Sequence, residues 1–356
     1  MGHQSKYFDA SDQAKAFVKS NVMVDSLTAP VSFGWPREEM FEEYHDRAYE
    51  TGIDVIGLTV SAGSQDFPAL VKQASQFFAH INQGERYEVI HSAPQINATL
   101  ERRKQALFFN CQGCECLNNS PHEYMPVLKG LGVGTMALAY NERFRAGDGC
   151  LVPTDEAGTV TMYGKQVIDA MHRNRVILDL SHGSERTALT AIEYSQETAP
   201  DKPVIYTHSN PRRVYDFFRS ISDAEARACA DTGGVVGVVM LPWFIDHYLT
   251  EETTPEMIVR AIDITVELVG IDHVGISSDD TYCWESMWTI AQRHPEWWQD
   301  DGQTAEAAKN KPSGSAEPAK IFPAIVDLLW KKGYSNEDIG KVLGGNLMRV
   351  YETVWK

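Results

Sequence analysis

The chain has 356 residues, 43% of them hydrophobic, and a formal net charge of −17. This length can bury a large core, and the negative charge disfavours nucleic acid or an anionic membrane surface as a partner. The sequence has no apolar run of about 18 residues, so it predicts no membrane span. Its beginning lacks the apolar core of a signal peptide, and six cysteines are too few for a disulfide framework. We therefore expect a cytoplasmic protein.

Eight short apolar segments alternate with helical segments along the chain. They are rich in β-branched residues and bounded by Gly, Pro, Asn or Asp, which is typical of strands buried on both faces of a parallel sheet. The predicted strands are residues 21–27, 54–61, 105–113, 133–140, 175–182, 203–209, 234–241 and 272–280. This alternation predicts a single (β/α)8 TIM-type barrel over residues 1–356. A doubly wound open sheet is the alternative, but no Gly-rich phosphate loop opens any of its helices.

Helical spacing and capping residues place the helices between these strands. The segment from Phe67 has a predicted apolar face of Phe67, Leu70, Val71, Ala74 and Phe78. The other predicted helices are residues 9–19, 98–104, 125–131, 163–174, 184–195, 222–233 and 254–270, followed by a helical C-terminal tail from Pro318. Residues 281–318 form a long polar excursion with four tryptophans, which we expect to be a flap over the barrel mouth or a subunit contact.

Polar residues lie where the predicted strands end, and in a barrel these ends meet at one rim. His182 and His208 end neighbouring strands and could share a metal ion; the alternative is two core histidines bonded to backbone. Asp279 could act as general base of a zinc-type hydrolytic site, or equally as a helix N-cap. The remaining polar candidates at the rim are Asp25, Ser26, Thr28, Gln112, Glu115, Tyr140, Asn141 and Asp280.

Five motifs give the chain a resemblance to a known family. They are VILDLSHGSERT, VIYTHSNPRRVYDFFRSISD, ACADTGGVVGVVMLP, VELVGIDHVGISSDD and LGGNLMRVYETVW. They resemble the membrane (renal) dipeptidase family of metallopeptidases, in the amidohydrolase superfamily, over residues 20–355. The resemblance implies an amidohydrolase-like (β/α)8 fold, homodimers and two zinc ions bridged by a glutamate.

The same resemblance implies roles for individual residues. His182 and His208 match the ligands of the second zinc, and Asp279 matches a first-zinc ligand or proton carrier. Arg219 matches the arginine that holds the carboxylate of a dipeptide substrate. We expect Tyr140 and Asn141, at the end of the fourth predicted strand, to be further substrate contacts. An alternative for Arg219 is an ion pair with an aspartate of its own loop, Asp216 or Asp223.

Several family ligands are missing from the matching positions. The family's first strand carries Asp-Gly-His-x-Asp, but this chain has Leu27 and Ala29 where the histidine and the second aspartate would bind the first zinc. Gln112 replaces the bridging glutamate. Tyr140 replaces the histidine that polarises the scissile carbonyl, although its hydroxyl can still donate a hydrogen bond. We therefore expect at most one zinc ion per chain, or none.

A single metal on His182 and His208 would need further ligands. The candidates are Gln112, Glu115 and a thiolate of Cys111 or Cys114. The stretch CQGCEC, which includes Cys116, has the character of a soft-metal site but lacks a second cysteine pair. Strand alternation also turns Cys111 away from Gln112, so the alternative is that these thiols pack as small apolar side chains.

Three functions are compatible with this reduced site. The first is a hydrolase of a dipeptide or small carboxylate-bearing amide that uses a single metal. The second is a metal-independent lyase or isomerase that uses Arg219 and an acid–base pair drawn from His182, His208, Asp279 and Tyr140. The third is a catalytically silent binding protein. We favour an enzyme, because joint retention of both histidines, the aspartate and the arginine is difficult to explain as packing.

Overall fold

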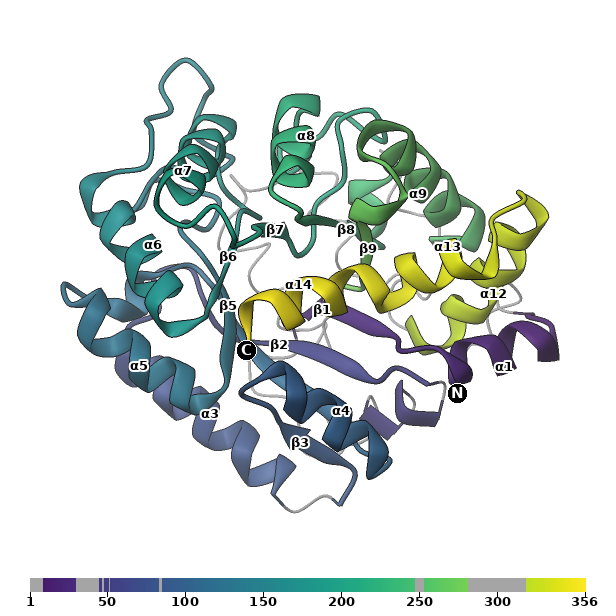
Figure 1. Ribbon diagram of the computed structural model, residues 1–356. Coiled ribbons are helices and arrows are strands. Elements are labelled where there is room, and N and C mark those ends of the chain that lie inside the picture. The colour runs from purple at the N-terminus through teal and green to yellow at the C-terminus, as the bar shows by residue number, and fades with distance from the viewer. Residues whose placement is uncertain are drawn as a thin grey trace.

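Eight parallel strands form the centre of the molecule in the order β1-β2-β4-β5-β6-β7-β8-β9, with helices around them (Figure 1). The computed structural model describes residues 9–29, 45–46, 48–50, 52–82, 85–246, 253–280 and 318–356. The strands are β1 (Val24–Thr28), β2 (Val55–Ala62), β4 (Gln105–Gln112), β5 (Val133–Ala137), β6 (Ile177–Asp179), β7 (Ile205–Tyr206), β8 (Val235–Val239) and β9 (Val274–Ser277). Each overlaps a predicted strand, and the (β/α)8 barrel is confirmed.

The barrel closes between its first and last strands. The Ser26 hydroxyl donates to the Ile276 carbonyl at 3.0 Å. Beyond the strands, the Ala29 N–H donates to the Asp280 carbonyl at 2.8 Å, and the Asp279 N–H donates to the Leu27 carbonyl at 3.0 Å. These bonds bring the ends of β1 and β9 together at the rim.

Helices follow most strands, and several begin at a side chain that caps them. Ser184, Thr161 and Thr254 each accept a hydrogen bond from the first turn, and Ser222 with Glu225 forms the predicted capping box. The helices are α1 (Asp12–Ser20), α3 (Phe67–Ile81), α4 (Ala93–Glu101), α5 (Pro121–Leu131), α6 (Met162–Asn174), α7 (Glu185–Thr198), α8 (Asp223–Asp231), α9 (Pro255–Val269), α12 (Pro318–Lys331), α13 (Asn336–Gly340), a π-helical turn (Lys341–Gly345) and α14 (Asn346–Val354), with short 3-10 turns η1 (Glu115–Leu117), η2 (Pro242–Phe244) and η3 (Ile271–His273).

The sequence prediction differs from the structure in three local details. Helix α4 starts earlier than residue 98 and is over before Arg103, which has a positive φ of 56°. A short strand β3 (Tyr87–Val89) pairs with β4; it was not predicted, because so short a segment shows no hydrophobic periodicity in the sequence. On α3 the buried face includes Phe77 and Ile81, whereas Val71 is 39% exposed. The buried face is therefore rotated around the helix axis relative to the predicted apolar face.

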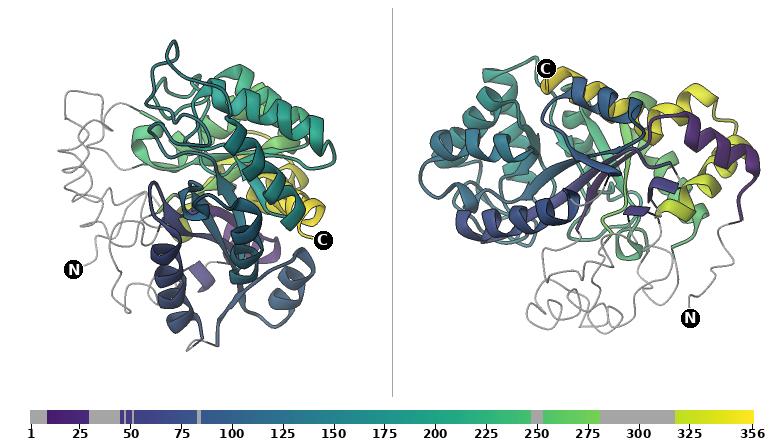
Figure 2. Two further views of the ribbon diagram at one scale, coloured as in Figure 1. Left: turned by 90° about the vertical axis from the view of Figure 1, so that its left-hand side faces the viewer. Right: turned by 90° about the horizontal axis from the view of Figure 1, so that it is seen from below.

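Helix α14 closes the end of the barrel where the strands begin, and the two further views place it at that end (Figure 2). Tyr351 and Trp355 stack on each other with ring centroids 4.2 Å apart, and Phe108 of β4 packs edge-on against Trp355 at 4.9 Å. A side chain at Gly134 would meet the Trp355 ring at 2.4 Å, so β5 needs glycine there. This end of the barrel is therefore filled, which leaves the opposite rim for a site.

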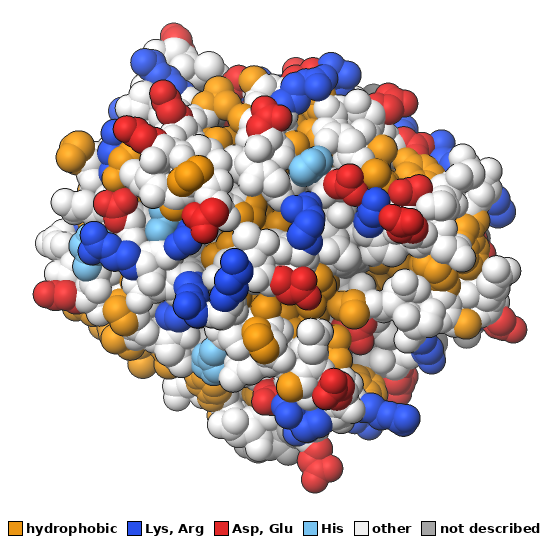
Figure 3. Space-filling view, viewed as in Figure 1, with side chains coloured by type: hydrophobic (Ala, Val, Ile, Leu, Met, Phe, Trp, Pro, Cys, Tyr) orange, Lys and Arg blue, Asp and Glu red, His pale blue; other side chains and the backbone are white. Residues whose placement is uncertain are grey.

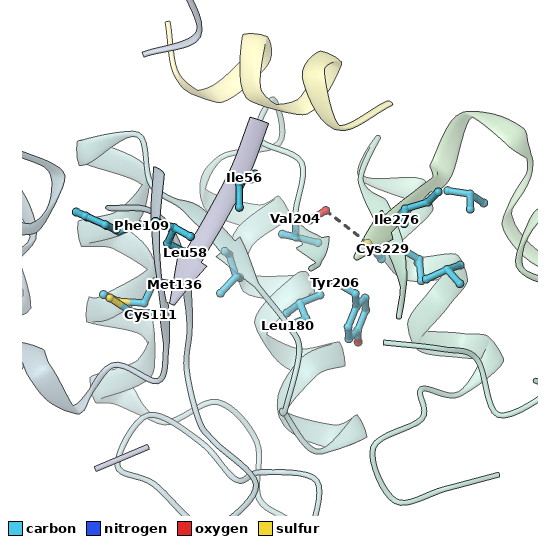
Figure 4. Close-up of a cluster of buried hydrophobic side chains, with 14 of the residues drawn as sticks. Ile56, Leu58, Phe109, Cys111, Met136, Leu180, Val204, Tyr206, Cys229 and Ile276 are labelled. Atoms are coloured by element: carbon cyan, nitrogen blue, oxygen red, sulfur yellow. Dashed lines mark hydrogen bonds between the residues drawn. The ribbon is translucent and has the colours of Figure 1, made fainter. Parts of the chain in front are cut away.

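A second apolar layer lies between the barrel and the surrounding helices. Figure 4 shows part of it, with Cys111 in one cluster with Leu58, Phe109 and Met136. Cys114 and Cys116 are also fully buried in this cluster. The packing of these thiols as small apolar side chains is the observed arrangement. A hydrogen bond with Cys116 and burial raise the pKa of Cys111 well above the usual thiol value, and burial does the same for Cys114.

Among the described helices, none combines the length and the apolar character that crossing a bilayer requires. The tail after Pro318 is helical as predicted, though divided into α12, α13 and α14. The tryptophan-containing excursion lies outside the described residues up to 317, so its predicted role stays a prediction.

Candidate active site at the carboxyl ends of the strands

The predicted polar residues gather at the rim opposite α14. Gln112 ends β4, Tyr140 and Asn141 follow β5, and His182 and His208 follow β6 and β7. Among the described residues, non-glycine residues with positive φ are few, and three of them lie here: Asn141 (58°), His182 (68°) and Asp279 (49°). Such conformations cost energy and concentrate at functional sites.

His208 is held by a chain of hydrogen bonds that starts at a buried carboxylate. The Thr207 hydroxyl donates to Asp179 Oδ2 at 2.6 Å, and His208 Nδ1 lies 2.7 Å from the same hydroxyl oxygen. Because the hydroxyl has one proton and gives it to the carboxylate, His208 must donate from Nδ1. A neutral His208 therefore presents a bare lone pair at Nε2.

His182 is held in the same way by an amide. Its Nδ1 lies 2.7 Å from Asn141 Oδ1, an acceptor, so Nδ1 is the protonated nitrogen. Its Nε2 lies 2.7 Å from Gln112 Oε1. The Gln112 amide is oriented by its other end, since Nε2 donates to the Thr59 hydroxyl at 2.8 Å. His182 thus also presents an Nε2 lone pair, towards an amide oxygen.

The two imidazoles and the amide point their acceptor atoms at one another. The Nε2 atoms of His182 and His208 are 2.9 Å apart, and Gln112 Oε1 is 2.7 Å from the first of them. Burial, together with the nearby charge of Arg219, lowers the pKa of both histidines well below the usual value. Both rings are therefore neutral near pH 7, and three lone pairs converge with no proton between them. This arrangement repels itself unless a cation lies among the three atoms.

The chemistry of these three donors fits one metal ion. Imidazole nitrogens are preferred zinc ligands, and each ring donates its other N–H to an oxygen, the usual support of a metal-binding histidine. Among the described residues, no group of three or more His, Cys, Asp and Glu side chains lies close enough to hold an ion. The third ligand available from the described part of the chain is therefore the neutral oxygen of Gln112.

Two other predicted ligand groups have different partners. Glu115 Oε2 accepts from Arg145 Nε at 3.1 Å. The Cys114 thiol donates to the Leu138 carbonyl at 3.2 Å, within the layer outside the barrel. The structure thus brings Gln112 to the histidines, and it shows no such contact for Glu115 or Cys114.

Leu27 and Ala29 occupy the other side of the rim, where the family resemblance implies the first zinc. Both are buried. The nearby Asp25 carboxylate accepts from the backbone N–H of Ser278 at 2.8 Å and from its hydroxyl at 2.5 Å. Burial raises the pKa of Asp25 to about 7 despite these bonds. This half of the rim therefore combines apolar side chains with a carboxyl that is partly protonated near neutral pH.

Asp279 is half-buried beside this carboxyl. Burial raises its pKa to about 8; the charge of Arg219 opposes the shift, and Asp25 and Asp280 add to it. Asp279 does not belong to a group of three potential ligands with the histidines in the described part of the chain. A carboxyl that changes protonation near pH 8 is suited to proton transfer.

Tyr140 and Arg219 flank the histidine pair. The Tyr140 ring stacks on His182 with centroids 4.0 Å apart and an interplanar angle of 25°. Arg219 is 6% exposed, lies over the Phe244 ring at 5.4 Å, and donates one long bond of 3.5 Å to the His208 carbonyl. The structure therefore places a buried guanidinium next to the metal-binding candidates.

The alternative ion pairs for Arg219 are taken by its neighbours. Asp223 accepts from Arg213 Nε at 2.8 Å, and Asp216 lies 4.0 Å from Arg212. No carboxylate in the described ranges forms an ion pair with Arg219. Neither aspartate therefore competes with a ligand for the Arg219 guanidinium.

Several residues of the site were not singled out from the sequence. Asp179 and Thr207 orient His208, Thr59 orients Gln112, and the Cys150 thiol lies 3.4 Å from Asn141 Oδ1. Asp179 and Thr207 interrupt the apolar runs that end in the two histidines, and a polar residue inside such a run is a detectable sign. Burial raises the pKa of Cys150 to about 11, so it is not a thiolate near neutral pH.

Comparison with known proteins shows the family to which the chain belongs and supports the fold. The family model "Membrane dipeptidase (Peptidase family M19)" matches residues 53–283. Dipeptidase tcpJ of Claviceps purpurea is 23% identical over 270 residues, which cover 76% of this chain and 56% of that protein. The chain spans about half the length of the curated dipeptidases that it matches.

Solved structures show the same fold. An amidohydrolase from Pseudomonas aeruginosa superposes with a TM-score of 0.81 at 25% identity, covering 96% of this chain and 99% of that one. A metallo peptidase from Rhodobacter sphaeroides, solved with a phosphinate mimic of the dipeptide L-Ala-D-Ala, has a TM-score of 0.71 at 14% identity, with 94% and 100% covered. With the family model matching more than half of the sequence, the chain belongs to the membrane dipeptidase family, Peptidase family M19.

Proposed function

We propose that this protein is a hydrolase of dipeptides or small carboxylate-bearing amides, with one metal ion held by His182, His208 and Gln112. The observation that carries the proposal is the convergence of three acceptor atoms, with the two Nε2 atoms 2.9 Å apart. A bound divalent ion would remove the repulsion between these atoms and supply Lewis-acid chemistry at the rim. Glu115 stays a proposed ligand only if its side chain leaves Arg145.

The chain's own residues would bind and orient the substrate. Arg219 provides a planar donor fork for a carboxylate, and its burial strengthens such a bond. Tyr140 and Asn141 border His182, where the amide to be cleaved would lie. The Tyr140 hydroxyl would donate to the carbonyl of that amide.

Asp279 would handle the proton. With its pKa near 8, it is mostly protonated at neutral pH and can donate to the amine that leaves. In its ionised form it can take a proton back from water in the next cycle. Asp279 would therefore act as general acid towards the leaving amine and as general base towards the water.

This site lacks parts that the family resemblance implies, so simple dipeptides should be poor substrates. The first ion would lack its histidine and aspartate ligands, because Leu27 and Ala29 stand at their positions. The negative charge between two ions would also be missing, because Gln112 replaces the bridging glutamate. Loss of a single oxyanion donor costs about 10²–10³ in rate, and loss of metal activation adds to it. We expect activity on a more reactive or specialised small carboxylate substrate.

The test is a turnover panel of L,L and L,D dipeptides and acyl amino acids with added Zn²⁺, Mn²⁺ or Co²⁺. The proposal predicts metal-dependent hydrolysis that His208→Ala abolishes. Activity that survives chelation and His208→Ala would refute the metal site. A turnover near the roughly 10 s⁻¹ of ordinary enzymes on simple dipeptides would refute the reduced site.

Two wider expectations are also proposals. The family resemblance implies a homodimer, which light scattering of the purified protein would test. The five cysteines in the described ranges are all free thiols, which supports a reducing compartment such as the cytoplasm.

A further inference from the structure

A small pocket opens beside the histidine pair, between the loops that follow β5, β6 and β7. Its empty volume is about 420 Å³, with open solvent at the mouth included. His182 and Arg219 line it, and Arg186 and Arg212 line it with Glu185 and Glu225. The pocket is therefore continuous with the proposed site and has its own set of charged side chains.

The charges of this pocket do not cancel. Glu225 is directed into the α8 capping box, where it accepts from the Ser222 N–H at 2.8 Å and from the Tyr206 hydroxyl at 3.1 Å. Glu185 is paired with Arg212 at 3.1 Å. Among the described residues, neither Arg186 nor Arg219 has an ion-pair partner; Arg186 donates to the Ala157 carbonyl at 3.2 Å.

This excess of positive charge is unusual in a chain with a net charge of −17. On the α14 end of the barrel, Lys and Arg are interspersed with Asp and Glu (Figure 3). In the pocket, by contrast, three arginines line one small volume, and one of them, Arg219, is buried. Guanidinium groups bind carboxylates through paired hydrogen bonds, so the pocket has the chemistry to hold an anion.

We propose that this pocket binds a second carboxylate of the substrate and makes the protein selective for substrates with an acidic side chain. The inference rests on the proposed function, in which Arg219 holds the first carboxylate. Arg212 and Arg186 would hold the second. The Arg212–Glu185 pair is partly solvent-exposed, and such pairs contribute little, so Arg212 can exchange Glu185 for a ligand.

The pocket walls favour a short acidic side chain. Leu180 and Ile221 are buried residues of the lining and offer apolar contacts to methylene groups. Guanidinium groups for a carboxylate and apolar walls for its methylene groups together match an aspartate or glutamate side chain. The preferred substrate class is therefore a dipeptide or acyl amino acid with a terminal Asp or Glu.

The primary experiment measures equilibrium binding of L-glutamate and L-glutamine by calorimetry, which does not require turnover. Wild-type protein should bind glutamate about tenfold or more tightly than glutamine, the scale of one lost charge-assisted hydrogen bond. Arg212→Gln should remove most of this preference, and Glu185→Gln should increase it. Arg213→Gln is the matched control, since Arg213 is adjacent in sequence but paired with Asp223 outside the pocket lining.

Equal binding of the two amino acids by wild-type protein would overturn the inference. So would a preference that persists in both Arg212→Gln and Arg186→Gln. If Arg212→Gln fails to fold, the opposite shifts expected from Arg186→Gln and Glu185→Gln still decide the question. A parallel comparison of kcat/KM on L-Ala-L-Glu and L-Ala-L-Gln separates the two proposals. Selective glutamate binding by a protein that hydrolyses no member of the dipeptide and acyl amino acid panel, with or without added metal, would refute the proposed function and leave the pocket inference standing.

Discussion

Replacing Gln112 with glutamate restores the negative charge that the metal site lacks. The side chain is 3% exposed, and its Oε1 already lies 2.7 Å from His182 Nε2. Gln112→Glu therefore puts a carboxylate oxygen at the position of the amide oxygen without moving the backbone. We expect the variant to bind zinc more tightly than wild-type protein.

The magnitude follows from the contacts that change. A charged hydrogen-bond acceptor is worth about 1–2 kcal/mol more than a neutral one, which corresponds to about 5–30-fold in the zinc Kd. The Gln112 donor to Thr59 is lost, but the Thr59 hydroxyl can turn to donate to the new carboxylate. Without zinc, the carboxylate raises the pKa of His182, so zinc must displace a proton. The gain should therefore be larger at pH 8 than at pH 6.

The assay is competition for zinc against a chromophoric chelator at both pH values. Asn110→Asp is the matched control, because it adds the same charge two residues earlier on β4, where Asn110 contacts Thr59 rather than the histidines. Tightening by the control as large as by Gln112→Glu would show a general charge effect. Unchanged or weaker zinc binding at pH 8 would refute the proposed ligand role of Gln112, and absence of zinc uptake by either protein would refute the ion site.

Three further predictions concern the same rim. Metal analysis after dialysis against excess zinc should give at most one ion per chain, and two would show that other ligands replace Leu27 and Ala29. Arg219→Ala should weaken the use of carboxylate substrates by about 2–3 kcal/mol in kcat/KM; unchanged kinetics with a lower Tm would instead indicate a structural role. The pKa of Asp279 is raised to about 8, above its unfolded value near 4, so the folded state holds the extra proton and stability falls as pH rises between these values. Urea unfolding at pH 5 and pH 9 should show a larger loss for wild-type protein than for Asp279→Asn, and equal losses would contradict the shift.

The barrel could be predicted from the sequence because its strands are buried on both faces. The run of residues 234–241 has no polar face, and that pattern leaves few alternatives to a parallel sheet covered by helices. Boundaries were less predictable. The bulk of β7 as predicted is loop, since only Ile205 and Tyr206 are strand and Thr207 bonds to Asp179 instead of extending the ladder. Helix α4 begins at Ala93, with Pro94 in its first turn, which is earlier than the predicted start at residue 98.

The histidine pair and Gln112 could be placed at one rim from strand order alone. Their mutual orientation could not, because it depends on bonds between side chains far apart in sequence, such as His182 to Asn141. Asn141 was expected to contact substrate, and the structure adds an orienting bond that no spacing rule predicts. Glu115 was expected near the metal because it follows β4, but η1 turns it towards Arg145.

The position of α14 has a consequence for how the chain folds. Its residues 346–355 cover the apolar floor formed by Val24, Val55, Ile177 and Val235, yet they follow all eight strands in sequence. During synthesis this floor stays open to water until α14 leaves the ribosome. Contacts between residues so far apart in sequence slow folding and prolong the exposure of apolar surface. Docking of α14 therefore buries the apolar surface through which the nascent barrel would aggregate or bind chaperones.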